Sequence, residues 1–198
     1  MTTKQILRFA QDDRNDMTPP AYLPSGRPVP GEYAAYAQAD LDFVTGTDAV
    51  AVLSTVAAET IALFSPLHDS RIAGVRYAPD KWTIKDVLGH LVDDERIMSY
   101  RALCLARGES LPLAGFDEKV YTAHAGAESR PLADLLAEYR AVREASLALF
   151  RSLTAEAWVR PGVANGHPVT ARGLAFHIAA HELHHLRIVR EKYLPLVR

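Results

Sequence analysis

Residues 173–193 read GLAFHIAAHELHHLRIVREKY, and this stretch decides the predicted fold class. On a helical wheel drawn at about 100° per residue, its branched apolar residues share one side, which predicts an amphipathic helix facing a core. His181 and His185 point to that side one turn apart, and His177 and His184 lie at its edges. Two imidazoles directed into a bundle at this spacing can bind one metal ion. The alternative is two core histidines, each with its own buried partner.

Helical periodicity and capping signals predict three more long helices. Thr83 and Asp86 form a capping-box pattern at the start of one of them, and Gly108 follows its end. Because no convincing alternating strand pattern lies between the helices, the predicted fold is an all-α four-helix bundle. The connection from Gly108 to about Ser129 suits a crossover between parallel neighbours or a loop over a site. The helices are expected over residues 48–65, 83–107, 130–153 and 171–193, the last ending before Pro195.

Residues 1–30 differ in composition from the rest of the chain. They hold five of the twelve prolines, and each proline removes a backbone donor that regular structure needs. We therefore expect a proline-rich N-terminal extension over residues 1–30, with Met17 as an alternative start, and one bundle domain over residues 31–198.

The composition argues against several functional classes. The formal net charge is −2 and the pI is about 6.4, which does not suit a surface that binds the nucleic-acid backbone. No apolar run reaches the roughly 18 residues that span a bilayer. The single cysteine, Cys104, excludes an intramolecular disulfide framework and a CxxC site. We expect a soluble, cytoplasmic protein that binds neither nucleic acid nor a membrane.

A third metal ligand is expected from another helix, and His90 is the candidate. It lies in WTIKDVLGHLVDDERI, residues 82–97, on a strip that borders the apolar side of that predicted helix. With His181 and His185 it would leave a position open on a divalent ion, zinc or nickel being the ions we expect. Asp94, one turn beyond His90, is a candidate to orient a ligand or to act as a base through water. The alternative is that Asp94 belongs to a solvated acidic run at residues 93–95.

Residues 181–185 also match HExxH, the zinc-protease pattern in which the glutamate is the general base. The longer metzincin pattern fails because Ile188 stands where glycine is required. Glu182 also points about 100° away from His181 on the helical wheel. The sequence therefore argues against a protease.

Several segments together resemble a known family. They are WTIKDVLGHLVDDERIMSYRALCLARGESLPLAGFDEKVY (82–121), LFRSL (149–153), NGHPVT (165–170) and HELHHLRIVREKYLP (181–195). They are similar to the DinB superfamily, and most similar to its YfiT-like branch, described as metal-dependent hydrolases and as bacillithiol S-transferases. The resemblance implies an up-down-down-up four-helix bundle with a long crossover between its second and third helices. It also implies a metal site made of one histidine from the second helix and an HxxxH pair from the last, here His90, His181 and His185.

The leading functional hypothesis is a metal-dependent S-transferase that conjugates a low-molecular-weight thiol to a small electrophile. A metal-dependent hydrolase that activates water at the same site is the alternative. A non-catalytic bundle that binds or senses a metal ion is the third reading. The opposite side of the last helix is also apolar, at Phe176, Leu183 and Leu186, and needs a cover. The N-terminal segment, another packed helix or a second subunit could provide it, and a homodimer is the prediction.

Overall fold

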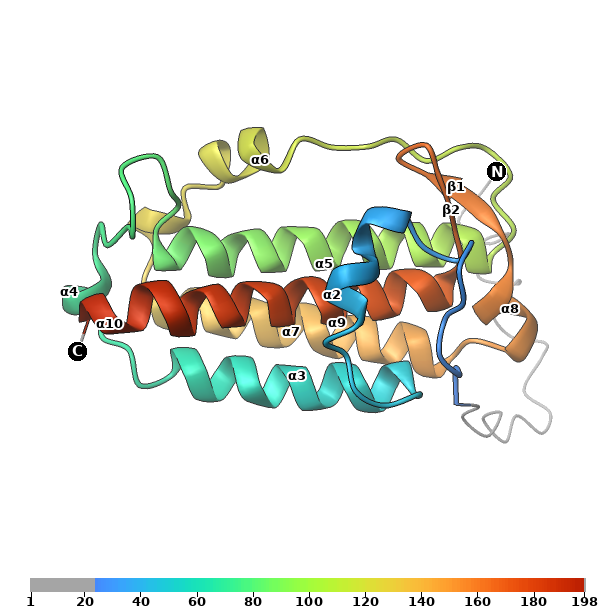
Figure 1. The fold of residues 1–198 in the computed structure, drawn as a ribbon, viewed down its shortest axis with the longest axis horizontal. Coiled ribbons are helices and arrows are strands. Elements are labelled where there is room, and N and C mark those ends of the chain that lie inside the picture. The colour runs from blue at the N-terminus through green and yellow to red at the C-terminus, as the bar shows by residue number, and fades with distance from the viewer. Residues whose placement is uncertain (1–23, 198) are drawn as a thin grey trace, which may run out of the picture.

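The computed structural model describes residues 24–197 (Figure 1). The expectations for residues 1–23, including the alternative start at Met17, lie outside the described residues. Four long helices form the bundle: α3 (Ala49–Phe64), α5 (Ile84–Ala106), α7 (Leu132–Arg151) and α9 (Ala171–Ile188). The shorter helices are η1 (Ala35–Ala37), α2 (Gln38–Leu41), α4 (Asp69–Ile72), α6 (Glu118–Ala125), η2 (Ala127–Ser129), α8 (Ala155–Val159), η3 (Val189–Tyr193) and α10 (Leu194–Val197).

The topology is the predicted up-down-down-up arrangement. Figure 1 shows α3 and α9 running in one direction and α5 and α7 in the other. Helix α5 packs against α7 and α9, and α3 packs against the same two helices from the other side. Since α5 and α7 are parallel, the chain must return along the whole bundle between them. The crossover that does so carries α6 over the outside of α5 (Figure 1).

The helix ends follow the local signals in the sequence. The side chain of Asp48 accepts a hydrogen bond from Ala51 N–H at the start of α3. Thr83 and Asp86 form both bonds of a capping box at the start of α5. Between the helices lies one core, in which the largest fully buried side chains include Leu53, Leu88, Leu135, Phe150 and Phe176.

The structure adds one short element for which the sequence showed no convincing strand pattern. Strands β1 (Gly162–Ala164) and β2 (His167–Val169) form an antiparallel hairpin before α9. Its two-residue turn is Asn165-Gly166, and both residues have positive φ (51° and 74°), as a type I′ hairpin turn requires. Backbone bonds also join Leu113 of the crossover to Val163 and Asn165. The hairpin therefore fixes the crossover to the end of the bundle.

The last helix also extends further than predicted. After α9 the backbone widens into the π-helical turn of η3 and then continues through α10, which contains Pro195. A π turn changes the hydrogen-bond register, which lets the helical path accommodate a residue that has no N–H donor.

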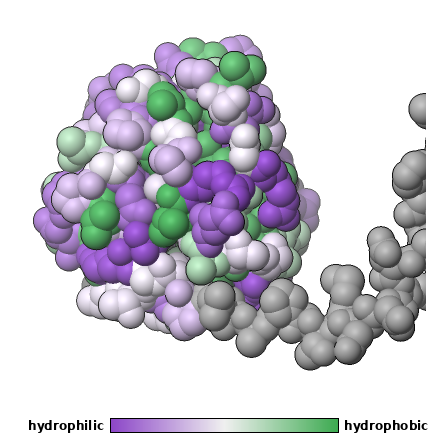
Figure 2. All heavy atoms as spheres, turned by 90° about the vertical axis from the view of Figure 1, so that its right-hand side faces the viewer, coloured by the Kyte–Doolittle hydropathy of each residue, from purple (hydrophilic) through white to green (hydrophobic). Residues whose placement is uncertain are grey.

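The apolar outer side of α9 is covered within the chain. Phe176 and Leu186 are fully buried, and Leu183 is partly buried against the same core. Helices α2 and α3 pack on α9, and the Arg27 guanidinium lies 5.8 Å from the Phe176 ring. Figure 2 shows polar and apolar residues interspersed over the end of the bundle where α8 and the hairpin lie. This side of α9 therefore gives no argument for a homodimer, which stays a prediction.

None of the helices in residues 24–197 combines the length and the apolar character needed to cross a membrane.

Candidate metal centre

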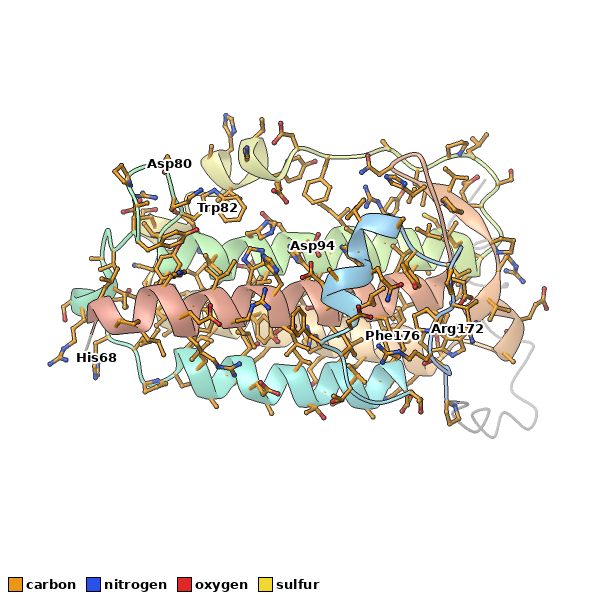
Figure 3. The ribbon with its side chains drawn as sticks, viewed as in Figure 1. His68, Asp80, Trp82, Asp94, Arg172 and Phe176 are labelled. Carbon is orange, nitrogen blue, oxygen red and sulfur yellow. The ribbon has the colours of Figure 1, made fainter. Side chains whose placement is uncertain are left out.

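Helices α5 and α9 place four polar side chains opposite one another. The two helices are antiparallel neighbours, so the turn that carries His90 and Asp94 faces the turn that carries His181 and His185. Residues four apart share one face of a helix, which brings both pairs to the contact between the helices. Figure 3 shows Asp94 at this contact and Trp82 at the start of α5.

The three histidines that the sequence singled out converge through the same ring atom. The Nε2 atom of His181 lies 3.1 Å from Nε2 of His90 and 3.1 Å from Nε2 of His185. All three atoms lie within 4.8 Å of one another. A tetrahedral zinc ion with Zn–N bonds of about 2.0–2.1 Å holds its ligand nitrogens roughly 3.4 Å apart. The donor set therefore suits a divalent metal ion in both its chemistry and its spacing.

Asp94 lies behind this histidine triad (His90, His181 and His185). Its Oδ2 atom is 3.2 Å from Nδ1 of His181, and the residue is 4 % exposed. Burial opposes the charge of Asp94, but His181 outweighs it and lowers the pKa of the carboxyl below its usual range. Burial likewise lowers the pKa of His181, but the charge and hydrogen bond of Asp94 raise it more. The contact favours a proton on Nδ1 of His181 and turns Nε2 toward the other two rings, so that a metal ion would be bound through Nε2.

The other two histidines are held in the neutral form. Burial, reinforced by the charge of His181, lowers the pKa of His90 to about 4 and that of His185 to about 2. The Trp82 ring packs over both, with its centroid 4.7 Å from that of His90 and 6.2 Å from that of His185. Neutral imidazoles present the lone pairs that a metal ion needs.

His177 and His184 lie beside the histidine triad rather than in it. The His177 ring stacks on His181 with centroids 5.8 Å apart. His184 turns away, and its Nδ1 atom lies 3.0 Å from a carboxylate oxygen of Asp40 in α2.

Glu182 faces the opposite side of α9. It is 2 % exposed and bonds to Thr60, Tyr139 and Arg143. An ion-paired carboxylate on that side of the helix has no access to the histidine triad. The structure thus agrees with the sequence argument against an HExxH protease.

Sequence reasoning missed the buried ionic network around Arg143. The guanidinium bonds to both carboxylate oxygens of Glu95, to Glu182 and to the carbonyl oxygen of Leu53. The sequence analysis left open that residues 93–95 form a solvent-exposed acidic run. This was wrong for Asp94 and Glu95, which are both buried. The sequence did contain one indication that Arg143 is buried. It lies four residues after Tyr139 and four before Leu147, and all three share the buried side of α7.

Two hollows adjoin the site. A cleft of about 550 Å³ lies beside His185, under the crossover helix α6. A cavity of about 30 Å³ lies beside His177, on the other side of His181. The cleft is lined by Tyr77, Asp80, Lys81, Trp82, Val87, Glu118, Lys119, His184, His185, Ile188 and Tyr193.

Comparison with known proteins extends this picture. A family model described as the DinB superfamily matches residues 52–189, which span the four long helices and the histidine triad. The fold is similar to that of YfiT from Bacillus subtilis, described as "a probable metal-dependent hydrolase with an unusual four-helix bundle topology". The TM-score is 0.64 at 22% sequence identity, covering 72% of this chain and 82% of that one. No curated protein matches the sequence.

Proposed function

Because the chain belongs to the DinB superfamily, we propose that it is a metal-dependent enzyme acting on small molecules. The observation that carries the proposal is the convergence of three imidazole Nε2 atoms with a buried carboxylate behind one of them. Structural metal sites are usually closed by four protein ligands, whereas three ligands leave a position for a reacting group. The histidine triad therefore suits chemistry better than it suits a purely structural role.

The residues around the triad have distinct tasks in this proposal. Asp94 keeps His181 in the tautomer that binds through Nε2. Trp82 packs against the rings of His90 and His185 and restricts their orientation. A divalent ion held there supplies Lewis acidity, which keeps a thiol or a water in its reactive deprotonated form at neutral pH. The cleft beside His185 is large enough for a small organic molecule.

Within this class we propose thiol S-transfer, in which a low-molecular-weight thiol attacks a small electrophile. What supports it is the volume of the cleft beside His185, about 550 Å³, which is enough for two small reactants to lie at one centre. The cleft carries both signs of charge, with Lys81 and Lys119 beside Asp80 and Glu118.

Metal-dependent hydrolysis is the second candidate. It is favoured by the description of YfiT, the protein of similar fold, as a probable metal-dependent hydrolase. A hydrolase needs only one organic substrate, and the cleft alone would hold it.

The experiment begins with elemental analysis of untagged protein, because a histidine tag itself binds metal. The protein, loaded with zinc or nickel, is then assayed for conjugation of monochlorobimane with several low-molecular-weight thiols, and against ester and amide substrates. Thiol-dependent turnover that is lost in His181→Ala supports transfer, and metal-dependent turnover without a thiol supports hydrolysis. His124→Ala is the matched control, since this exposed histidine lies outside the triad and its ring bonds the carbonyl oxygen of Val120 within α6. If neither activity appears while metal raises the melting temperature, the protein is a metal-binding or sensing bundle.

A further inference from the structure

Arg101 is a buried cation with an unusual set of partners. It is 5 % exposed, and its guanidinium bonds to the carbonyl oxygen of Ala114 (2.6 Å) and to the sulfur of Met98 (3.4 Å). Within residues 24–197 no carboxylate oxygen lies within ion-pair distance of it. The other deeply buried arginine, Arg143, bonds two carboxylates. The Phe116 ring lies 5.7 Å from the guanidinium, and the charge of Asp94 acts on it from beyond ion-pair distance while Asp94 contacts His181. A buried guanidinium without a contact ion pair is costly, so an anion from outside the chain would complete this arrangement.

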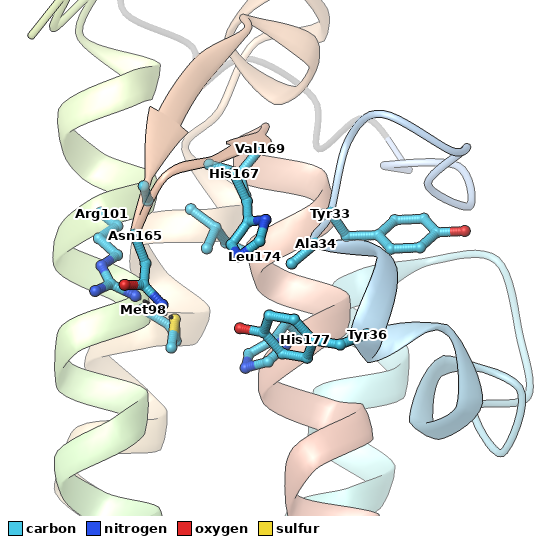
Figure 4. A pocket seen from close by; sticks show the side chains of 12 residues that line it. Tyr33, Ala34, Tyr36, Met98, Arg101, Asn165, His167, Val169, Leu174 and His177 are labelled. Atoms are coloured by element: carbon cyan, nitrogen blue, oxygen red, sulfur yellow. Dashed lines mark hydrogen bonds between the residues drawn. The ribbon is translucent and has the colours of Figure 1, made fainter. Parts of the chain in front are cut away.

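The Arg101 side chain lines the small cavity beside His177. Figure 4 shows Arg101 and Asn165 on one side of it and His177 and Tyr36 on the other. Asn165 projects from the hairpin turn, and Tyr36 comes from η1. At about 30 Å³ the cavity has room for a group of a few atoms and not for a whole ligand. Its lining is partly apolar, at Ala34, Met98, Ala164, Val169 and Leu174, and its polar side chains include Arg101, Asn165, Tyr36 and His177.

The cavity adjoins the metal centre. Asp94, Met98 and Arg101 follow one another along the same face of α5, and His177 precedes His181 by one turn of α9. The rings of His177 and His181 are stacked, so the wall of the cavity is also the side of the histidine triad. With a rise of 1.5 Å per residue, Asp94 and Arg101 are roughly 10 Å apart along the helix axis. A small molecule is long enough to reach both.

We propose that Arg101 binds the carboxylate of a small-molecule ligand whose other end lies at the histidine triad, so that the substrates of this site are carboxylate-bearing molecules. The claim that the ligand's other end reacts at the histidine triad rests on the proposed function. The claim that Arg101 binds a carboxylate does not. One guanidinium matches the single charge and flat shape of a carboxylate, to which it donates two parallel hydrogen bonds. A phosphate is bulkier and carries more charge than one cation balances. Asn165 and Tyr36 also line the cavity, and their side-chain amide and hydroxyl groups can donate hydrogen bonds.

The test uses acetate as the probe and the full-length, metal-free, ¹⁵N-labelled protein. Metal is removed because carboxylates also bind metal ions. The Nε–H resonance of Arg101, assigned by its loss in Arg101→Gln, reports directly on the guanidinium. Acetate is expected to shift this resonance saturably at constant ionic strength, whereas neutral acetamide leaves it unchanged. Loss of a charge-assisted hydrogen bond weakens binding by about tenfold or more, so Arg101→Gln is expected to lose acetate binding to that extent.

Arg160→Gln is the matched control. Arg160 also bonds a backbone carbonyl oxygen, that of Ala106 (2.6 Å), but does not line the cavity, so the variant reports what loss of such a bond does to the fold. It is expected to bind acetate like the wild type. An Arg101 resonance that acetate does not move, an equal response to acetamide, or tighter binding of inorganic phosphate overturns the proposal. Because the readout is made without metal, a negative result here leaves the proposed enzyme activity standing, and an inactive enzyme leaves this result standing.

Discussion

The hydrogen bond from His181 to Asp94 predicts that Asp94→Asn weakens metal binding by about tenfold. The carboxylate is buried and accepts the Nδ1 proton at 3.2 Å. A hydrogen bond to a charged group contributes about 1.5–3 kcal/mol, and one between neutral groups contributes about 1 kcal/mol. The difference of one to two kcal/mol corresponds to roughly a tenfold change in an equilibrium constant. The asparagine side chain keeps the size of the aspartate, so the change removes the charge and leaves the packing intact.

The measurement is competition between the untagged protein and a fluorescent zinc chelator at neutral pH. Asp93→Asn is the matched control, because Asp93 is the preceding residue, is partly exposed, and lies 3.7 Å from the Arg96 guanidinium. We expect Asp93→Asn to bind zinc as the wild type does. If Asp94→Asn binds zinc within twofold of the wild type, or if both variants weaken binding equally, then Asp94 does not hold a metal ligand in place.

Three further predictions concern stability. Arg143→Met leaves two buried carboxylates without their cation and is expected to lower the free energy of unfolding by about 3–5 kcal/mol in a urea titration; a loss under 1 kcal/mol contradicts this. Gly173→Ala is expected to cost about 1–3 kcal/mol, because the added Cβ would overlap the carbonyl oxygen of Glu32; an unchanged urea midpoint would show that the two segments are not in contact. The metal-free protein is expected to lose stability as pH falls from about 6.5 to 4, because burial lowers the pKa of His90 to about 4 and its protonation then favours the unfolded chain. Melting curves of His90→Gln over the same range are expected to depend less on pH, and equal slopes for the two proteins contradict the assignment.

The long helices could be predicted because their signals are local. The capping box at Thr83 and Asp86 depends on residues three apart, and the apolar stripes depend on residues three and four apart. The same reasoning found the His181 and His185 pair. The Asn165-Gly166 turn was an equally local signal, but the strands beside it are only three residues long and show no alternation that stands out from a loop.

The partners of buried charges could not be predicted in the same way. Asp94 and Glu95 are neighbours in the sequence, yet one faces His181 and the other faces Arg143. That both are buried, and against which partners, depends on how α5 packs between α7 and α9, which is a property of the tertiary structure. A run of three acidic residues reads as solvated until the cations and histidines that face it are known.

The two sides of α9 connect the histidine triad to the buried ionic network around Arg143. His181 and Glu182 are consecutive, so the helix turns one toward the histidine triad and the other toward Arg143. On α5, Asp94 likewise faces His181 of the triad, and Glu95 faces Arg143. Arg143 of α7 therefore links α5 to α9 at the level where the histidine triad is formed, and Thr60 adds α3 to the same network.

Ligand nitrogens about 3 Å apart tolerate little sliding between the helices that carry them. A buried ionic contact between those helices restricts that sliding, since any shift would separate charges that no water can reach. The glutamate of the apparent HExxH motif thus serves to hold the two helices in register, and its ion pair is the reason that it is not free to act as a base.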